Sequence, residues 1–540
     1  MGDNKKKSIS RKNALKTLGG LALFPLASSI PSKATSHEEN SHSKTKLFSS
    51  HKSKKGEVPN ILFIIDDQHR SDFLGASGAD WIKTPNLDKL AKEGARFSNA
   101  YCALPSCTPA RTSILTGLKP WNHGMLGYMD TISQYYNQTM PQFFSEMGHQ
   151  TIVVGKNHFG PPRNSNGYLT SKLEEGWYSS RKDGFDCDYQ SWFDREAPDK
   201  DMNATGLGYT DHRGIPFKYE DKLHATHWTA ERAIEFLQQS EDEAPWFLKL
   251  SFQRPHPPFD PPKRWFDYYM SVDIPKPKVG DWAKEKYKGK FSTLEKTPSA
   301  SSGIFPDDDI KTSRAAYAAS ISFVDEQLGR VIDELKKTGQ YENTFILFVS
   351  DHGDMMGDQY MWRKCRAYEP SSNVPMIIRW PQMHGFNFER GQVRDELIEL
   401  RDIFPTFADV CSFTIPKPID GKSMLNILKE KKDWRKTLCL EHSKVYEPDN
   451  AWVAITDARH KYIFFTLTGE EQLFDLEKDP DELTNIVKLE SSKEVYQNLY
   501  AELVKELTER GPKWVENGKL QIQKTSDLTG DKFPKTHPSY

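Results

Sequence analysis

Four short apolar runs in the first two thirds of the chain each end in a group of ionisable residues. The runs are NILFII, TIVVG, WFLKLSF and FILFVS, followed in that order by Asp66-Asp67-Gln68, Lys156-Asn157-His158, Arg254-Pro255-His256 and Asp351-His352-Gly353-Asp354. Apolar runs of this length without polar alternation are typical of strands that are buried on both faces. The pattern therefore predicts four buried strands with charged side chains at their carboxyl ends.

Segments with helical patterns lie between these runs. Pro85 and Pro141 begin two of them, a glycine ends each, and a long one runs from about Asp309 to Lys337. Alternating strands and helices predict an α/β fold with a large, mainly parallel sheet sandwiched by helices. Because ligands bind such sheets beyond the carboxyl ends of the strands, the four charged groups are expected to meet in one crevice.

The pattern changes after about residue 430. AWVAITD, HKYIFFTL and QLFDLEKDPDE have the pattern of short strands, and KEVYQNLYAELVKELTER that of an amphipathic helix. These segments predict a catalytic domain over residues 58–430 and a smaller C-terminal subdomain over 431–540, built from an antiparallel sheet and a helix. Two stretches without periodicity, 161–225 and 261–308, are expected to be long loops that either shape access to a site or are inert insertions.

The first residues have the anatomy of a signal peptide, with a basic start and an apolar run too short to span a bilayer. Residues 1–27 are predicted to be this signal, and the polar residues 28–57 a disordered linker. Ser10-Arg11-Lys12 resembles a twin-arginine signal with lysine in place of the second arginine. The protein is thus expected in the periplasm or outside the cell; the alternative interpretation is a disordered basic tail.

Composition excludes several classes of function. The 73 basic and 75 acidic residues among 540 give a formal charge of -2, so no global field attracts nucleic acid or a membrane surface. Six scattered cysteines without a CxxC pair argue against a disulfide framework and a structural zinc site. We also expect no later membrane span.

The charged groups at the strand ends combine acidic and basic side chains. Asp66, Asp67 and Asp351 offer the oxygen ligands that calcium or magnesium requires, with His352 beside them. An isolated Asp-Asp pair is more often a turn or cap, but a second acidic group at another strand end favours a metal. Five basic residues are expected in the same crevice, where they would hold a tetrahedral anion beside the metal: Arg111, Lys156, His158, His256 and Lys364.

Five further motifs occur along the chain after the linker: Cys107-Thr108-Pro109-Ala110-Arg111 with Thr116-Gly117, GKNHFG, SDHGDMMGDQYMWRK, VPMIIRWP and LFDLEKDPDE. They resemble the motifs of the sulfatase family, the formylglycine-dependent C-x-P-x-R type within the alkaline phosphatase superfamily. They occur in the order that the family shows and span most of the chain after the linker.

This resemblance implies that a maturation enzyme oxidises Cys107 to formylglycine (3-oxoalanine), which then acts as the nucleophile at the start of a helix. It also implies one calcium ion per chain, bound by Asp66, Asp67, Cys107, Asp351 and His352. By the same resemblance Arg111 and Lys156 hold the formylglycine, His158 assists elimination, and His256 and Lys364 bind sulfate and assist the leaving oxygen. The sequence departs from the family at His352, where many relatives carry Asn, and at Asn157, where an aromatic residue is common.

The predicted function is hydrolysis of a sulfuric ester on a carbohydrate, as in the degradation of a sulfated polysaccharide or its oligosaccharides. Export and aromatic-rich loops favour such a substrate. One alternative is a phosphonate monoester or phosphodiester hydrolase of the same superfamily. The other is a sugar-binding protein without catalytic activity.

Overall fold

The computed structural model describes residues 56–176, 187–240, 244–431 and 433–534. The predicted signal peptide and nearly all of the predicted linker lie outside the described residues. Within the described part of the chain, none of the helices combines the length and the apolar character that crossing a membrane requires.

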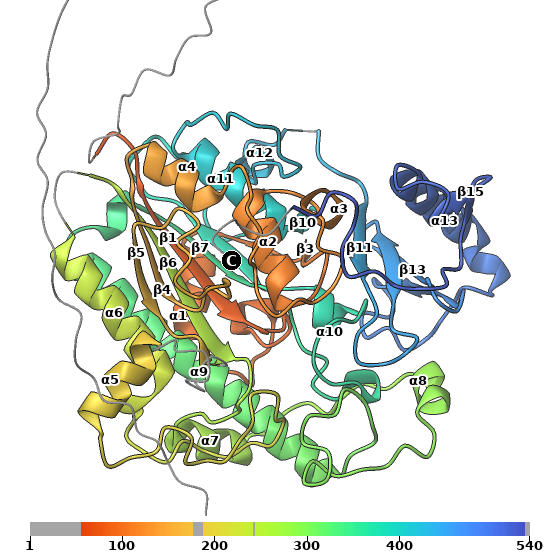
Figure 1. Ribbon diagram of the computed structural model, residues 1–540, viewed down its shortest axis with the longest axis horizontal. Coiled ribbons are helices and arrows are strands. Elements are labelled where there is room, and N and C mark those ends of the chain that lie inside the picture. Colours follow the sequence, from red (N-terminus) through yellow and green to blue (C-terminus); the bar gives the residue numbers. More distant parts are fainter. Residues whose placement is uncertain (1–55, 177–186, 241–243, 432, 535–540) are drawn as a thin grey trace, which may run out of the picture. The chain divides into compact units, whose positions relative to one another are not determined.

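The first part of the described chain forms an eight-stranded sheet, whose strands lie in the order β5-β4-β6-β1-β7-β8-β2-β9 (Figure 1). Only β8 runs antiparallel to its neighbours. The four strands predicted from the apolar runs are adjacent and parallel, which confirms that part of the prediction. The strands are β1 (Asn60–Asp67), β2 (Ala95–Phe97), β4 (Gln150–Gly155), β5 (Thr170–Leu173), β6 (Trp246–Pro255), β7 (Thr344–Ser350), β8 (Met376–Arg379) and β9 (Gln392–Arg394).

Helices cover both faces of this sheet, because alternate side chains of each strand point to opposite faces. In β1, Ile61, Phe63 and Ile65 belong to one hydrophobic core, and Leu62 and Ile64 belong to another. The first core includes side chains of α2 (Cys107–Thr116), α4 (Met140–Glu146), α11 (Ile403–Val410) and α12 (Leu425–Leu428). The second includes side chains of α1 (Pro85–Lys92), α6 (Ala225–Gln239) and α9 (Asp307–Lys337). The expected α/β sandwich is confirmed.

The expectation that 161–225 and 261–308 are structureless loops is wrong in part. They contain β5, α5 (Asp188–Glu196), α7 (Lys263–Ser271) and α8 (Asp281–Lys286). These elements have four to nine residues, which is too few for a hydrophobic period to stand out among the surrounding turns.

The C-terminal part forms the predicted antiparallel sheet and helix. Its strands are β11 (Leu438–His442), β12 (Trp452–Thr456), β13 (His460–Phe465) and β14 (Glu471–Asp475), and α13 (Lys493–Thr508) packs on one face through Leu499, Leu503 and Leu507. The other face shares a core with side chains of the α/β part, such as Tyr101 and Met355. Shorter elements complete the fold: β3 (Ala100–Tyr101), β10 (Ile398–Glu399), β15 (Val515–Glu516), β16 (Lys519–Leu520), α3 (Pro120–His123) and α10 (Glu369–Ser372).

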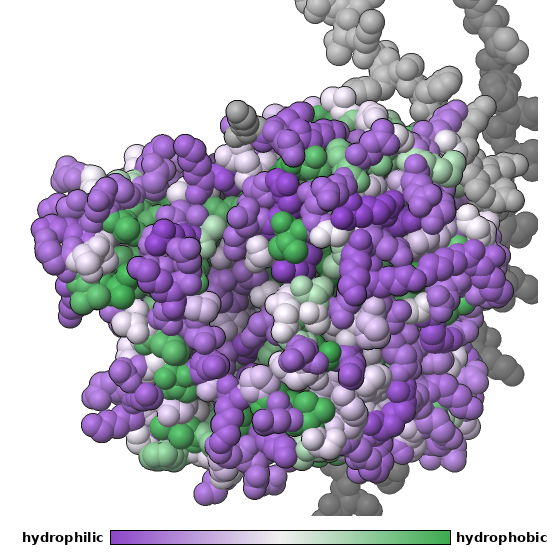
Figure 2. Space-filling model, turned by 180° about the vertical axis from the view of Figure 1, so that it is seen from behind, coloured by the Kyte–Doolittle hydropathy of each residue, from purple (hydrophilic) through white to green (hydrophobic). Residues whose placement is uncertain are grey.

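Hydrophilic side chains cover most of the face shown in Figure 2, and apolar side chains occur there in small, separate groups. Broad contiguous apolar patches are the usual mark of a docking surface for proteins or membranes. Among the described residues on this face, the apolar groups do not join into such a patch. The more informative surface is the pocket at the carboxyl ends of the strands.

Candidate active site and metal centre

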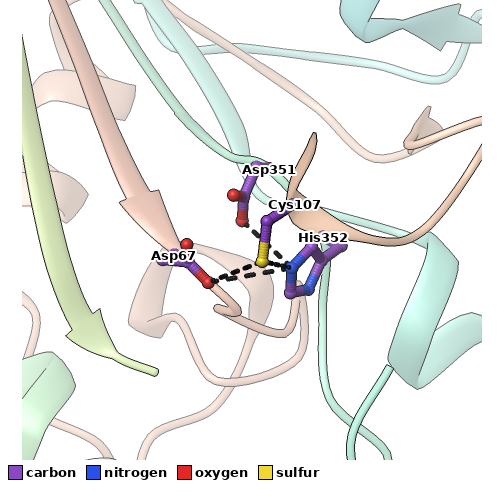
Figure 3. Close-up of side chains that lie close together, drawn as sticks. All are labelled: Asp67, Cys107, Asp351 and His352. Carbon is purple, nitrogen blue, oxygen red and sulfur yellow. Dashed lines mark hydrogen bonds and ion pairs between the residues drawn. The ribbon is translucent and has the colours of Figure 1, made fainter. Parts of the chain in front are cut away.

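Four side chains from three parts of the sheet region converge on one point. Asp67 ends β1, Cys107 begins α2, and Asp351 and His352 follow β7 directly. One ligand atom from each of the four lies within 4.8 Å of the others. Figure 3 shows the carboxylates, the sulfur and the imidazole pointing toward one another. The crevice expected at the strand ends therefore exists.

The thiol of Cys107 lies at the centre of this group. The backbone is extended at Ser106 and turns helical at Cys107, so the side chain projects from the first residue of α2. Its Sγ lies 2.8 Å from Lys364 Nζ, 3.1 Å from His352 Nε2 and 3.7 Å from Asp67 Oδ1. Burial, with the charge of Asp67, raises the pKa of the thiol to about 11. An unmodified Cys107 is thus a protonated thiol near neutral pH and a weak nucleophile.

Buried cations balance the negative charges of the two carboxylates, Asp67 and Asp351. Asp67 Oδ2 accepts hydrogen bonds from Lys156 Nζ at 2.6 Å and from Arg111 Nη2 at 3.2 Å. Arg111 Nε also donates to Asp351 Oδ2 at 2.9 Å. Burial opposes the charged form of Asp67, but the cations Lys156, Lys364 and Arg111 outweigh it and hold its pKa well below the usual value. Asp67 therefore stays ionised.

The hydrogen bonds of His352 fix its tautomer. Nδ1 lies 2.9 Å from the carbonyl oxygen of Gly353, which can only accept, so Nδ1 carries the proton. Burial lowers the pKa of this histidine, which keeps the ring neutral. Nε2 therefore presents a lone pair to Asp67, Cys107 and Asp351, which is the form that binds a metal.

Asp66 is the one predicted ligand that the structure does not bring into this group. Its Oδ2 lies 2.7 Å from Nδ1 of His69. Its Oδ1 is buried and has no hydrogen-bond partner among the described residues. A buried carboxylate oxygen without a donor is costly, and a cation is a partner that would remove this cost.

The remaining predicted residues lie in or beside one cavity of about 220 Å³. Lys364 Nζ bridges the sulfur of Cys107 and Oε1 of Gln68, the latter at 2.9 Å. Arg111 and Lys156, which were expected to hold residue 107, form hydrogen bonds with the two carboxylates. The residues that line the cavity are Gln68, Cys107, Tyr128, His158, Tyr209, Thr210, His256, Pro257, Arg363, Lys364 and Tyr446.

The two histidines in the cavity are both uncharged. Burial, followed by the charges of Lys156 and Arg111, holds the pKa of His158 well below its usual value. Burial and then the charge of Lys364 do the same for His256. Nδ1 of His256 lies 2.8 Å from the carbonyl oxygen of Pro257 and donates to it, which makes Nε2 an acceptor until an anion binds nearby.

Sequence reasoning missed several residues of the cavity wall. Gln68 was placed at the end of the first strand, after Asp66-Asp67, but was given no role in the site. Tyr209 belongs to the stretch 161–225, which therefore does shape the pocket. Tyr128 and Tyr446 come from irregular segments without any periodic signal.

The C-terminal sheet supports the two segments that carry Cys107 and Lys364. In β11, Glu441 N donates to Ala103 O at 2.8 Å, and His442 Nε2 lies 3.1 Å from Ser106 Oγ. Beside the lysine, Trp452 Nε1 donates to the carbonyl oxygen of Cys365 at 3.1 Å. The sheet is thus part of the framework of the site.

Comparisons with known proteins agree with this geometry. Residues 59–412 match the family model "Sulfatase", and 357–509 match "N-sulphoglucosamine sulphohydrolase, C-terminal". The chain is 40% identical to an arylsulfatase of Clostridium perfringens, covering 86% of this chain and 97% of the relative. It is 30% identical to a choline-sulfatase of Rhizobium meliloti, covering 80% and 82%. A phosphonate monoester hydrolase of Agrobacterium radiobacter superposes with a TM-score of 0.69 at 26% identity, covering 84% and 96%.

Proposed function

Because the chain belongs to the sulfatase family of the alkaline phosphatase superfamily, we propose that its substrate is a sulfated carbohydrate. Hydrolysis of sulfate esters follows from the family. The observation that carries the active-site assignment is the position of Cys107 at the start of α2, 3.1 Å from His352 and 2.8 Å from Lys364. The match of residues 357–509 to the C-terminal region of a sugar sulfohydrolase supports the carbohydrate.

The proposed nucleophile is residue 107 after oxidation to formylglycine by a maturation enzyme. A buried thiol with a pKa of about 11 has little reactivity of its own, which favours the converted residue over the thiol as the nucleophile. The hydrated aldehyde supplies two hydroxyls, one to take up the sulfuryl group and one whose deprotonation releases sulfate and restores the aldehyde. His158 lines the same cavity and is neutral, which is the form that accepts this proton.

The proposed metal is one calcium ion, held by Asp67, Asp351 and His352 with residue 107. Two carboxylates and the oxygen of a converted residue 107 make a mainly hard ligand set, and the buried Oδ1 of Asp66 is a further oxygen nearby in sequence. A bound divalent cation would polarise an oxygen of the sulfate ester and offset charge in the transition state. Arg111 and Lys156 keep the carboxylates ionised and fix their orientation.

Removal of the metal is expected to lower stability as well as activity. An ion that binds only the folded chain stabilises it by about 2.7 kcal/mol when its free concentration is 100 times the Kd. Chelation should therefore lower both the melting temperature and kcat, and added calcium should restore both. Metal analysis of the purified protein tests the identity directly, and stoichiometric zinc, or no metal at all, would contradict calcium.

His256 and Lys364 are proposed to act on the sulfate and on the departing oxygen. When the S–O bond breaks, charge develops on the sugar oxygen, and an alkoxide leaves poorly without a proton or a cation. Lys364 reaches the Sγ of Cys107, so it can hold a sulfate bound there. His256 lines the same cavity, and a bound anion would raise its pKa and load Nε2 with a proton.

This division of roles predicts different substrate profiles for two variants. His256→Ala should lower kcat/KM for a sugar sulfate by about 10²-fold. It should affect an activated nitrophenyl sulfate much less, because a nitrophenolate leaves without a proton. Lys364→Ala should lower both values. Equal losses on both substrates in His256→Ala would leave only sulfate binding to that residue.

A phosphonate monoester or phosphodiester hydrolase remains the second candidate, because one structural relative is a phosphonate monoester hydrolase. A panel of nitrophenyl sulfate, phosphate diester and phosphonate monoester separates the two by kcat/KM.

For the cellular setting, we propose export to the periplasm or beyond, on the basis of residues 1–27. The proposed division into a catalytic domain of 58–430 and a subdomain of 431–540 follows the change of pattern in the sequence.

A further inference from the structure

We propose that the natural substrate carries a second anionic group, and that Arg363 binds it. The group is a carboxylate or a second sulfate on the same sugar or its neighbour. This inference deepens the proposed function and rests on the proposed active site. It identifies a class of substrate within the sulfated carbohydrates and assigns a specificity role to a residue outside the sulfate-binding set.

Arg363 lines the same cavity as Cys107 and Lys364 but lacks a counter-ion. Its guanidinium lies over the ring of Tyr446, 4.8 Å from the ring centroid. No ion pair to it occurs among the described residues, and none of the side chains lining the cavity is acidic. Other arginines around the site are all paired, as in Arg70 with Asp358, Arg254 with Asp260 and Arg366 with Glu447.

The backbone holds Arg363 in this place at some cost. Its φ is 68°, in the left-handed region that a residue with a Cβ seldom adopts, and Cys365 has the same value. Strain of this kind persists where the surroundings over-determine it. Here the backbone N of Arg363 donates to Asp354 Oδ1 at 2.9 Å, and its carbonyl accepts from Met355 N at 2.8 Å. The lysine that contacts residue 107 and the unpaired arginine are thus fixed side by side.

A half-buried guanidinium without a counter-ion is an anion-binding group. Its planar fork forms two parallel hydrogen bonds with a carboxylate or a sulfate, and the tyrosine beneath it fixes the plane. The sulfate to be cleaved already has Lys364 beside residue 107. The charge of Arg363 is therefore available to a different anionic group of the same ligand.

The same wall disfavours a cationic substrate such as choline sulfate. A quaternary ammonium group needs open aromatic faces or a carboxylate. Of the three tyrosines in the cavity, Tyr446 lies under Arg363, and the ring of Tyr209 packs 4.6 Å from that of His256, which leaves only the half-buried Tyr128 to offer an open face. A cation in this pocket would meet Arg363 and no acidic side chain.

Matched substrates test the inference with the intact, converted enzyme. One pair is a hexosamine monosulfate and the same sugar with a second sulfate or a linked uronate. The other pair is 4-nitrophenyl sulfate with and without a ring carboxylate. We expect Arg363→Gln to lower kcat/KM for the two-anion member by about 10- to 100-fold relative to the one-anion member. Arg363→Lys, which keeps the charge, should recover part of this difference.

Lys444→Gln is the matched control, because this exposed lysine lies two residues from Tyr446 and does not line the cavity. It should change kcat/KM by the same factor for both members of a pair. The inference would be overturned if the converted wild-type enzyme preferred one-anion substrates or choline sulfate. It would also be overturned if Arg363→Gln lowered kcat/KM equally for both members of a pair. If only the aryl pair is hydrolysed and shows the Arg363 dependence, the assignment of anion binding to Arg363 stands, but the carbohydrate in the proposed function and in this inference fails.

Discussion

Replacing Cys107 with alanine is expected to abolish hydrolysis of every sulfate ester, with kcat/KM falling by about 10⁴-fold or more. Residue 107 lies at the meeting point of Asp67, His352 and Lys364, and no other described cysteine belongs to that group. Alanine removes the atom that conversion to formylglycine requires, while the helix that begins at this position tolerates alanine well. Steady-state kinetics and a thermal melt measure the two effects separately.

The matched control is Cys102→Ala. Cys102 is also fully buried, but it packs in the hydrophobic core and its Sγ contacts Leu104 O at 3.1 Å. This variant should lose some stability and keep its activity. The mass of the peptide containing residue 107, from protein produced with a maturation enzyme, tests the conversion itself. Unmodified thiol in a fully active preparation would refute the formylglycine nucleophile, and normal turnover by Cys107→Ala would refute the site.

Replacing Asp67 with asparagine is expected to remove metal binding and most activity, with a loss in kcat of about 10³-fold or more, and to destabilise the protein. Asp67 is the carboxylate that meets both Lys156 and Arg111, and all three side chains are buried. The amide keeps the shape but leaves Lys156 without its counter-ion. Breaking a buried pair in this way typically costs about 3–5 kcal/mol. Metal content, kcat and the free energy of unfolding are the measurements.

Asp358→Asn separates a lost ion pair from a lost ligand. Asp358 Oδ2 lies 2.7 Å from Nη2 of Arg70, and both side chains are buried, but neither belongs to the four-residue group. This control should lower stability while metal content stays stoichiometric. If Asp67→Asn also kept its metal and lost only stability, Asp67 would be a structural residue and not a ligand.

The core of the site was predictable from the sequence because it follows from parallel strands. Asp67, Lys156, His256 and Asp351 follow buried apolar runs, and adjacent parallel strands bring their carboxyl ends together. The motif that begins with Cys107 placed that residue at a helix start, where the structure has it. Boundaries of the central strands and of α9 also agree closely, because long runs of buried residues leave little ambiguity.

The cavity wall was not predictable in the same way. Tyr209 and Tyr446 come from irregular segments, whose course depends on contacts distant in sequence. Asp66 shows a second limit, since adjacent residues at a strand end point to opposite sides, and its Oδ2 turns to His69. The roles assigned to the individual residues stay predictions.

The contact of β11 with the segment before Cys107 sets a time limit on any modification of that residue. Cys107 is 1% exposed in the folded chain, so a second protein can reach it only before the fold closes around it, and the contact of His442 with Ser106 is part of that closure. These two residues are 336 positions apart in the chain. At typical rates of protein synthesis, ribosomes need roughly 20 s to one minute to make that length. A maturation enzyme therefore has at least this interval to act, and one that is slower than folding would leave a folded, inactive thiol form in the population.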